Sequence, residues 1–115
     1  MADPSFEMTA SGRCVVARVS GDMDYLTDWV FRARFQDLTA RPERLMVLDL
    51  SGVVFCDSAG LSVLLGVWRQ ADAGGAVLVL AGVSESVRRI LEMTGVDRVM
   101  RVFDTVPEAA AVCGS

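Results

Sequence analysis

Apolar residues alternate with polar ones, or form short uninterrupted runs, in five separate segments of the chain. Short runs bounded by turn residues are typical of β-strands. Strands are therefore predicted over residues 6–10, 14–20, 45–50, 77–81 and 99–103. The turn at Ser11, Gly12 and Arg13 joins the first two as a hairpin. The run from Leu45 to Leu50 is almost purely apolar, as in a parallel strand buried on both faces.

Between these runs the apolar residues follow the spacing of a helix. Helices are predicted from a cap at Thr27 or Asp28 to about residue 40, from Ser58 to about residue 73, and from a Ser84 cap to Gly95. A fourth, short helix runs from the Thr105 to Glu108 capping box to about residue 112. In the second helix four residues form the expected buried stripe: Leu61, Leu64, Leu65 and Trp68.

The predicted order is β-β-α-β-α-β-α-β-α. Alternating strands and helices favour an α/β layer fold, with a mixed, mostly parallel sheet and helices packed against it. The length of 115 residues suits one domain. We therefore expect a single domain over 1–115, with its core at about 6–112.

The chain lacks residues that several common catalytic and binding sites require. It contains no histidine and no lysine, and all 11 basic residues are arginine. Catalytic triads that need histidine and phosphate loops that need lysine are thereby excluded, so we expect no enzyme. The net charge is −4 and no basic patch is visible, so no nucleic-acid partner is expected.

The three cysteines, Cys14, Cys56 and Cys113, are isolated and have no CxxC spacing. We expect reduced thiols, no metal site and no cofactor. Cys56 lies two residues before Ser58, so a redox role and a small buried side chain are both open interpretations. A divalent cation at Asp22 and Asp24 is a weaker alternative to a solvated or partner-facing loop.

The chain carries no apolar run long enough to span a membrane, which takes roughly 20 residues. Residues 1–10 lack the basic and apolar regions of a signal peptide. The expectation is a cytoplasmic protein that does not bind a membrane.

After the strand 45–50 we expect a short loop, which ends in the main candidate site, Asp57-Ser58-Ala59-Gly60, at the start of the second long helix. Free backbone N–H groups and the helix dipole favour a phosphate there. Asp57 and Ser58 are also ordinary helix-capping residues, and a capping role is compatible with modification of the serine. Nucleophilic catalysis is disfavoured because only a carboxylate could accept the proton of the hydroxyl.

Four residues, Ser58, Ser62, Gly66 and Arg69, fall roughly along one stripe of the same helix. Small residues on a stripe allow another backbone to approach closely. Tight packing of Gly66 against the chain's own sheet is the alternative interpretation.

The motifs, taken in order, resemble the STAS domain of bacterial anti-sigma factor antagonists over about residues 12–112. The resemblance rests on the loop 21–24, the strand 48–53, the motif 57–61, the turn and strand 74–82, and the helix with its end at 87–96. In that family the serine at the position of Ser58 is the regulatory phosphorylation site.

The resemblance implies a partner switch. The unphosphorylated protein would bind an anti-sigma factor that is itself a serine kinase with a GHKL-type ATP site, and the sigma factor would be released. Phosphorylation of Ser58 would end the binding, and a PP2C-type phosphatase would restore it. ATP and Mg²⁺ would belong to the kinase. The alternative is a scaffold subunit of a lipid-transport or stress-signalling complex, in which Ser58 only caps a helix.

The partner-binding residues implied by the resemblance are Asp24, Asp57, Ser58, Ala59, Gly60 and Ser62. A phosphate adds about −1.5 to −2 charges. Beside Asp57, and near Asp24 if the fold brings that loop alongside, we expect bulk and like-charge repulsion to block the partner locally, without refolding. The protein is expected to be a monomer or a weak homodimer.

Overall fold

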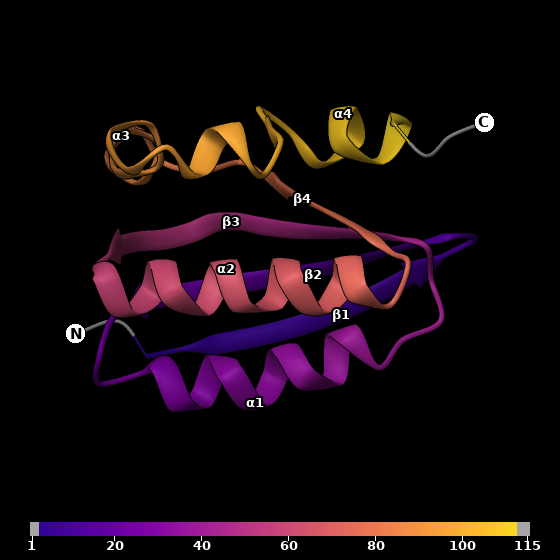
Figure 1. Cartoon of the computed structure of the whole chain (residues 1–115), viewed down its shortest axis with the longest axis horizontal. Helices are drawn as coiled ribbons and strands as arrows, with labels where there is room; N and C mark the ends of the chain where they lie inside the picture. The colour runs from indigo at the N-terminus through magenta and orange to yellow at the C-terminus, as the bar shows by residue number, and fades with distance from the viewer. Residues whose placement is uncertain (1–2, 113–115) are drawn as a thin grey trace.

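A computed structural model describes residues 3–112, and these form one α/β domain (Figure 1). The strands and helices follow the predicted order, with one 3₁₀ turn added at Val96–Arg98. The elements are β1 (Ser5–Ser11), β2 (Cys14–Met23), α1 (Asp28–Thr39), β3 (Leu45–Cys56), α2 (Ser58–Ala73), β4 (Val77–Ala81), α3 (Glu85–Thr94), β5 (Val102–Phe103) and α4 (Val106–Ala111).

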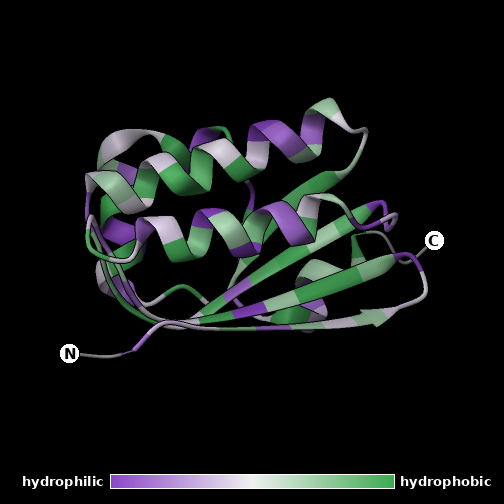
Figure 2. Ribbon diagram, turned by 90° about the horizontal axis from the view of Figure 1, so that it is seen from below, coloured by the Kyte–Doolittle hydropathy of each residue, from purple (hydrophilic) through white to green (hydrophobic). Residues whose placement is uncertain are grey.

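The five strands form one sheet in the order β1-β2-β3-β4-β5. Strands β1 and β2 are antiparallel, and every later neighbour pairs in parallel. The sheet is therefore mixed and mostly parallel, as the alternation of strands and helices predicts. Helices α1 and α2 run side by side along it, and Figure 2 shows the helical layer over one side of the sheet.

The core occupies both faces of β3. Met46, Leu48 and Leu50 are fully buried in the large cluster that joins the sheet to α1, α2 and α3. Leu45 and Val47 lie in a smaller cluster with Ala109 of α4. Successive strand side chains point to opposite faces, so a run that is apolar at every position belongs in the middle of a covered sheet.

Strands β2 and β3 run three or more residues beyond their predicted ends, and these extensions lead into the candidate site. β3 continues to Cys56 and β2 continues to Met23, where loops were expected. The two extensions pair with each other, including Gly21 with Val53 and Met23 with Cys56, with two irregularities in register. Glycine and aspartate have low intrinsic strand propensity, so tertiary pairing decides these segments.

Two other expectations were wrong in detail. The last strand begins at Val102, because Val99 and Met100 continue the turn that follows α3, with both N–H groups donating to the Val96 carbonyl. On α2, Leu65 and Trp68 are only partly buried. The most buried side chains of α2 include Val63, Leu64, Val67 and Ala71, and two of these, Val63 and Val67, line a groove together with Phe35 of α1.

Among residues 3–112, no helix combines the length and the apolar character that a membrane crossing requires.

Candidate functional site

The site is the junction between β3 and α2, where the chain passes from strand to helix through a single residue. β3 ends at Cys56, Asp57 has an extended backbone, and α2 begins at Ser58. The short loop expected before Asp57 is absent because residues 51–56 are part of the strand. The junction is therefore held by the sheet on one side and by the helix on the other.

Asp57 is the residue that caps α2. Its Oδ1 accepts a hydrogen bond of 3.0 Å from the backbone N–H of Gly60. Ser58 occupies the first helical position and is exposed, and within residues 3–112 its hydroxyl makes no hydrogen bond. The interpretation of Ser58 as the capping residue is therefore wrong. Its hydroxyl is free to react without the loss of a structural contact.

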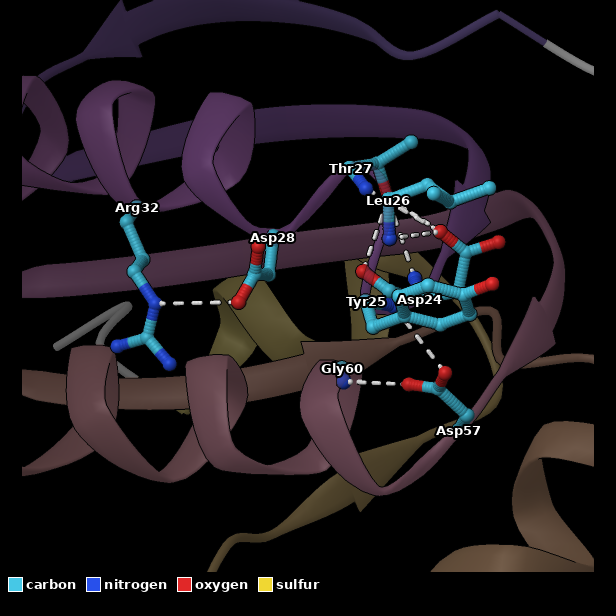
Figure 3. A network of polar contacts seen from close by, with 8 residues as sticks. All are labelled: Asp24, Tyr25, Leu26, Thr27, Asp28, Arg32, Asp57 and Gly60. Carbon is cyan, nitrogen blue, oxygen red and sulfur yellow. Dashed lines mark hydrogen bonds and ion pairs between the residues drawn. The ribbon is translucent and has the colours of Figure 1, made fainter.

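The second carboxylate oxygen of Asp57 reaches a distant part of the chain. Asp57 Oδ2 accepts a 3.1 Å hydrogen bond from the backbone N–H of Tyr25, and the Asp57 N–H donates to the carbonyl of Met23 at 3.1 Å. Figure 3 shows this carboxylate between Gly60 on one side and Tyr25 on the other. Asp57 thus fastens the segment after β2 to the start of α2.

Asp24 lies in this fastened segment, between the two residues that bond to Asp57. Its Oδ1 accepts from the N–H groups of Leu26 and Thr27 at 3.0 and 3.2 Å, which folds the segment into a turn before α1. The Thr27 hydroxyl donates to the Asp22 carbonyl at 2.7 Å. The structure therefore brings the Asp24 loop alongside the Ser58 end of α2, as the resemblance requires.

Gly60 permits the close approach of α2 to the end of β2. A Cβ atom at this position would collide with the Met23 carbonyl oxygen and would lie 2.8 Å from Cys56 Sγ. Ala59 is half-buried beside it, and Ser62 is exposed one turn further on. The predicted positions 57–60 and 62 are thus gathered on the first turns of one helix.

Cys56 lies beneath the site with almost no exposed surface. Burial, followed by the charge of Asp57, raises the pKa of its thiol to about 12. A thiol that stays protonated at neutral pH is a poor nucleophile and a poor redox sensor. The structure favours the small buried side chain over the redox role, while Cys113 lies outside the described residues.

The stripe of small residues on α2 leaves Gly66 open. Apart from the adjacent residues and the backbone of its own helix turn, no atom of residues 3–112 lies within 4 Å of the position that its Cβ would take. Gly66 instead lines a groove of about 290 Å³ between α1 and α2, together with Phe35, Val63 and Gln70. Tight packing against the chain's own sheet is therefore wrong, and approach by a partner remains a prediction.

Sequence reasoning missed Tyr25 as part of the site, because it takes part through its backbone N–H, for which the side-chain identity gives no signal. Thr27 was predicted as a possible cap of the first helix, and it does occupy the cap position of α1. Its bonds to Asp24 were not predicted, although an aspartate three residues before a threonine at a helix start is typical of a capping turn.

The sequence of the chain matches the model of a known protein family. The model of the STAS domain matches residues 5–109. The chain belongs to the STAS domain family. The match includes every element from β1 to β5 and most of α4.

Individual relatives agree with the assignment. The anti-sigma F factor antagonist of Paenibacillus polymyxa is 29% identical over 99 residues, which cover 85% of each chain. The crystal structure of an anti-sigma factor antagonist from Mycobacterium paratuberculosis superposes with a TM-score of 0.88, at 21% identity over 98% of this chain and 96% of that one. This STAS domain therefore shares its fold with a solved anti-sigma factor antagonist.

A third relative has been solved in two chemical forms. The Bacillus protein SpoIIAA matches in its unphosphorylated form with a TM-score of 0.77, at 24% identity over 96% of this chain and 98% of that one. In its phosphorylated form the TM-score is 0.70, at 22% identity over 95% and 99%. Both forms of that protein have the fold of this STAS domain.

Proposed function

We propose that this protein is an anti-sigma factor antagonist whose binding is switched at Ser58. In the unphosphorylated form it binds an anti-sigma factor, which is a serine kinase with a GHKL-type ATP site, and the sigma factor is released. Phosphorylation of Ser58 ends the binding, and a PP2C-type phosphatase restores it. The protein acts by binding and is not an enzyme, and ATP and Mg²⁺ belong to the kinase.

One observation carries the proposal: the exposed Ser58 hydroxyl makes no hydrogen bond within residues 3–112, while Asp57 caps the helix in its place. A kinase can reach this hydroxyl, and its modification removes no contact that the fold needs. The name of the Paenibacillus polymyxa relative, an anti-sigma F factor antagonist, supports the same function.

The phosphate acts at short range. It adds about −1.5 to −2 charges in the residue next to the Asp57 carboxylate. The Asp57 carboxylate accepts hydrogen bonds from the N–H groups of Gly60 and Tyr25. Repulsion between the phosphate and this carboxylate therefore acts on the hydrogen bonds that position the segment after β2. A partner surface that fits a small neutral hydroxyl does not fit a phosphate. A loss of ~3 kcal/mol in binding free energy weakens the affinity more than a hundredfold. The helix N-terminus tolerates the charge, so refolding is not required.

The test is phosphorylation in vitro. Each GHKL-type kinase encoded in the source genome is incubated with the protein and ATP·Mg²⁺, and the product is analysed by intact mass and site mapping. We expect a single phosphate on Ser58, lost in Ser58→Ala and retained in Ser62→Ala. Absence of phosphate with every kinase, or a phosphate mapped only to Ser62, would contradict the proposal.

A further inference from the structure

Three large apolar side chains are exposed on the segment that Asp57 holds in place. Tyr25 is 71% exposed, Trp29 is 70% exposed and Leu26 is 51% exposed. We call these three residues the 25–29 patch. Tryptophan and tyrosine normally bury most of their surface, and a group of exposed large apolar residues marks a contact surface.

The 25–29 patch has no role in the core of this domain. Phe31, Phe35 and Leu38 form the buried face of α1. Trp29 lies two residues before Phe31, which places it about 200° around the helix axis at 100° per residue. The side chain therefore points away from the sheet, and its exposure is a consequence of the helix register.

The position of the patch is fixed by the same bonds that build the site. The Tyr25 N–H is held by Asp57, and the Leu26 and Thr27 N–H groups are held by Asp24. Figure 3 shows these bonds converging on the turn between β2 and α1. A contact surface that is ordered before binding loses less conformational entropy when a partner docks.

Acidic residues border the 25–29 patch. Asp22, Asp24 and Asp57 lie on the backbone segments that meet there, and Asp28 begins α1. Of these four, only Asp28 has a basic partner within residues 3–112 at this end of the domain, Arg32 at 3.8 Å. An apolar centre with an acidic border is complementary to an apolar pocket with basic residues around it.

We propose that the 25–29 patch is the surface on which the anti-sigma factor docks, and that this partner presents an apolar pocket bordered by basic side chains. The inference rests on the proposed function and adds the residues that supply the binding energy. Aromatic side chains at the centre of an interface dominate its energetics. Because Asp57, the residue before Ser58, accepts a hydrogen bond from the Tyr25 N–H of the patch, modification of the serine and docking on the patch involve one continuous surface.

The test measures affinity for each purified GHKL-type kinase domain encoded in the source genome, with ADP and Mg²⁺ present. Trp29→Ala and Tyr25→Ala remove exposed side chains and leave the Tyr25 N–H in place. Each is expected to weaken binding about tenfold or more. Met93→Ala is the matched control, because Met93 is 79% exposed on α3. Its affinity is expected to stay within about twofold of the original. Circular dichroism checks that all three variants remain folded.

The outcomes separate the inference from the proposed function. Unchanged affinity in both aromatic variants overturns the inference, even if Ser58→Asp abolishes binding. If the aromatic variants bind more weakly and Ser58→Asp binds fully, the docking surface is supported and the proposed switch at Ser58 is contradicted. Absence of binding to every kinase domain overturns both.

The border of the patch has a test of its own. The association rate for the kinase domain that binds is measured at about 50 mM and about 500 mM NaCl, between which electrostatic attraction is strongly screened. A rate that falls several-fold supports a basic partner surface. A rate that does not change overturns that part of the inference.

Discussion

The carboxylate of Asp57 joins two segments that are 32 residues apart, because its Oδ2 accepts from the Tyr25 N–H at 3.1 Å while its Oδ1 accepts from Gly60 at 3.0 Å. One side chain thereby caps α2 and positions the turn before α1. The residue that follows it, Ser58, is exposed. Structural support and the reactive hydroxyl are thus assigned to adjacent residues, so that one can be modified while the other keeps the fold.

Replacement of the two neighbours should separate these roles. Asp57→Ala removes the helix cap and the bond to Tyr25, and we expect it to lower the free energy of unfolding by about 1–3 kcal/mol. Ser58→Ala removes no hydrogen bond found among residues 3–112 and should change the free energy of unfolding by less than ~0.5 kcal/mol. Urea denaturation measures both values. An equal loss in the two variants would show that Ser58 shares the capping role.

Two glycines on α2 form a matched pair. Gly60→Ala places a Cβ against the Met23 carbonyl and near Cys56, and should destabilise the protein by about 1–3 kcal/mol. Gly66→Ala meets no atom of residues 3–112 beyond its own helix turn within 4 Å and removes a glycine from a helix interior, so it should stabilise the protein by about 0.5–1 kcal/mol. Thermal denaturation compares the two. Stabilisation by Gly60→Ala would disprove the close approach of α2 to β2.

The Cys56 thiol should be inert in the folded protein. Burial raises its pKa to about 12, so it stays protonated at pH 8. In a Cys14→Ser, Cys113→Ser background, a thiol reagent should label Cys56 slowly in buffer and rapidly in urea. Rapid labelling in buffer would restore the redox interpretation.

The same shift predicts a dependence of stability on pH. The thiol pKa is higher in the folded state than its ordinary value of 9.0, so the folded state favours the protonated form. This contribution is complete below about pH 9 and is lost as the pH rises toward about 12, because only the unfolded chain ionises in that interval. The free energy of unfolding, measured by urea denaturation at each pH, should therefore fall more steeply between about pH 9 and 12 in the original protein than in Cys56→Ala. The same dependence on pH in both proteins would contradict the raised pKa of the Cys56 thiol.

Phosphorylation should loosen the bond between Asp57 and Tyr25. With phosphoserine incorporated at position 58 during synthesis, hydrogen exchange of the Tyr25 amide should become about tenfold faster. This corresponds to a decrease of ~1.4 kcal/mol in the free energy that protects the amide. Amides of residues 45–50, in the middle of β3, should exchange as before. Equal exchange at Tyr25 in both forms would rule out transmission through Asp57, and faster exchange throughout β3 would indicate refolding.

The sequence predicts the layers of this fold well, because the run from Leu45 to Leu50 and the helical stripes are local patterns. It fails where tertiary pairing outweighs local preference. Gly21 and Asp22 have weak strand propensity, yet they pair with the end of β3. That extension decides the geometry of the site, since it places Met23 and Tyr25 against Asp57.

The site itself was predictable to within one residue. Asp57 and Ser58 are both good capping residues, and only the structure shows that Asp57 has the extended backbone of the cap. The exposure of Trp29 follows from a local pattern, because Phe31, Phe35 and Leu38 mark the buried face of α1 and Trp29 lies about 200° around the helix from Phe31.

Ser58 phosphorylation and binding of the anti-sigma factor should exclude each other. The most direct measurement isolates the protein from its source cell, separates the free form from the form bound to the anti-sigma factor, and maps Ser58 in each by mass spectrometry. We expect phosphate on Ser58 in the free fraction and an unmodified serine in the complex. Equal phosphate at Ser58 in both fractions would contradict it.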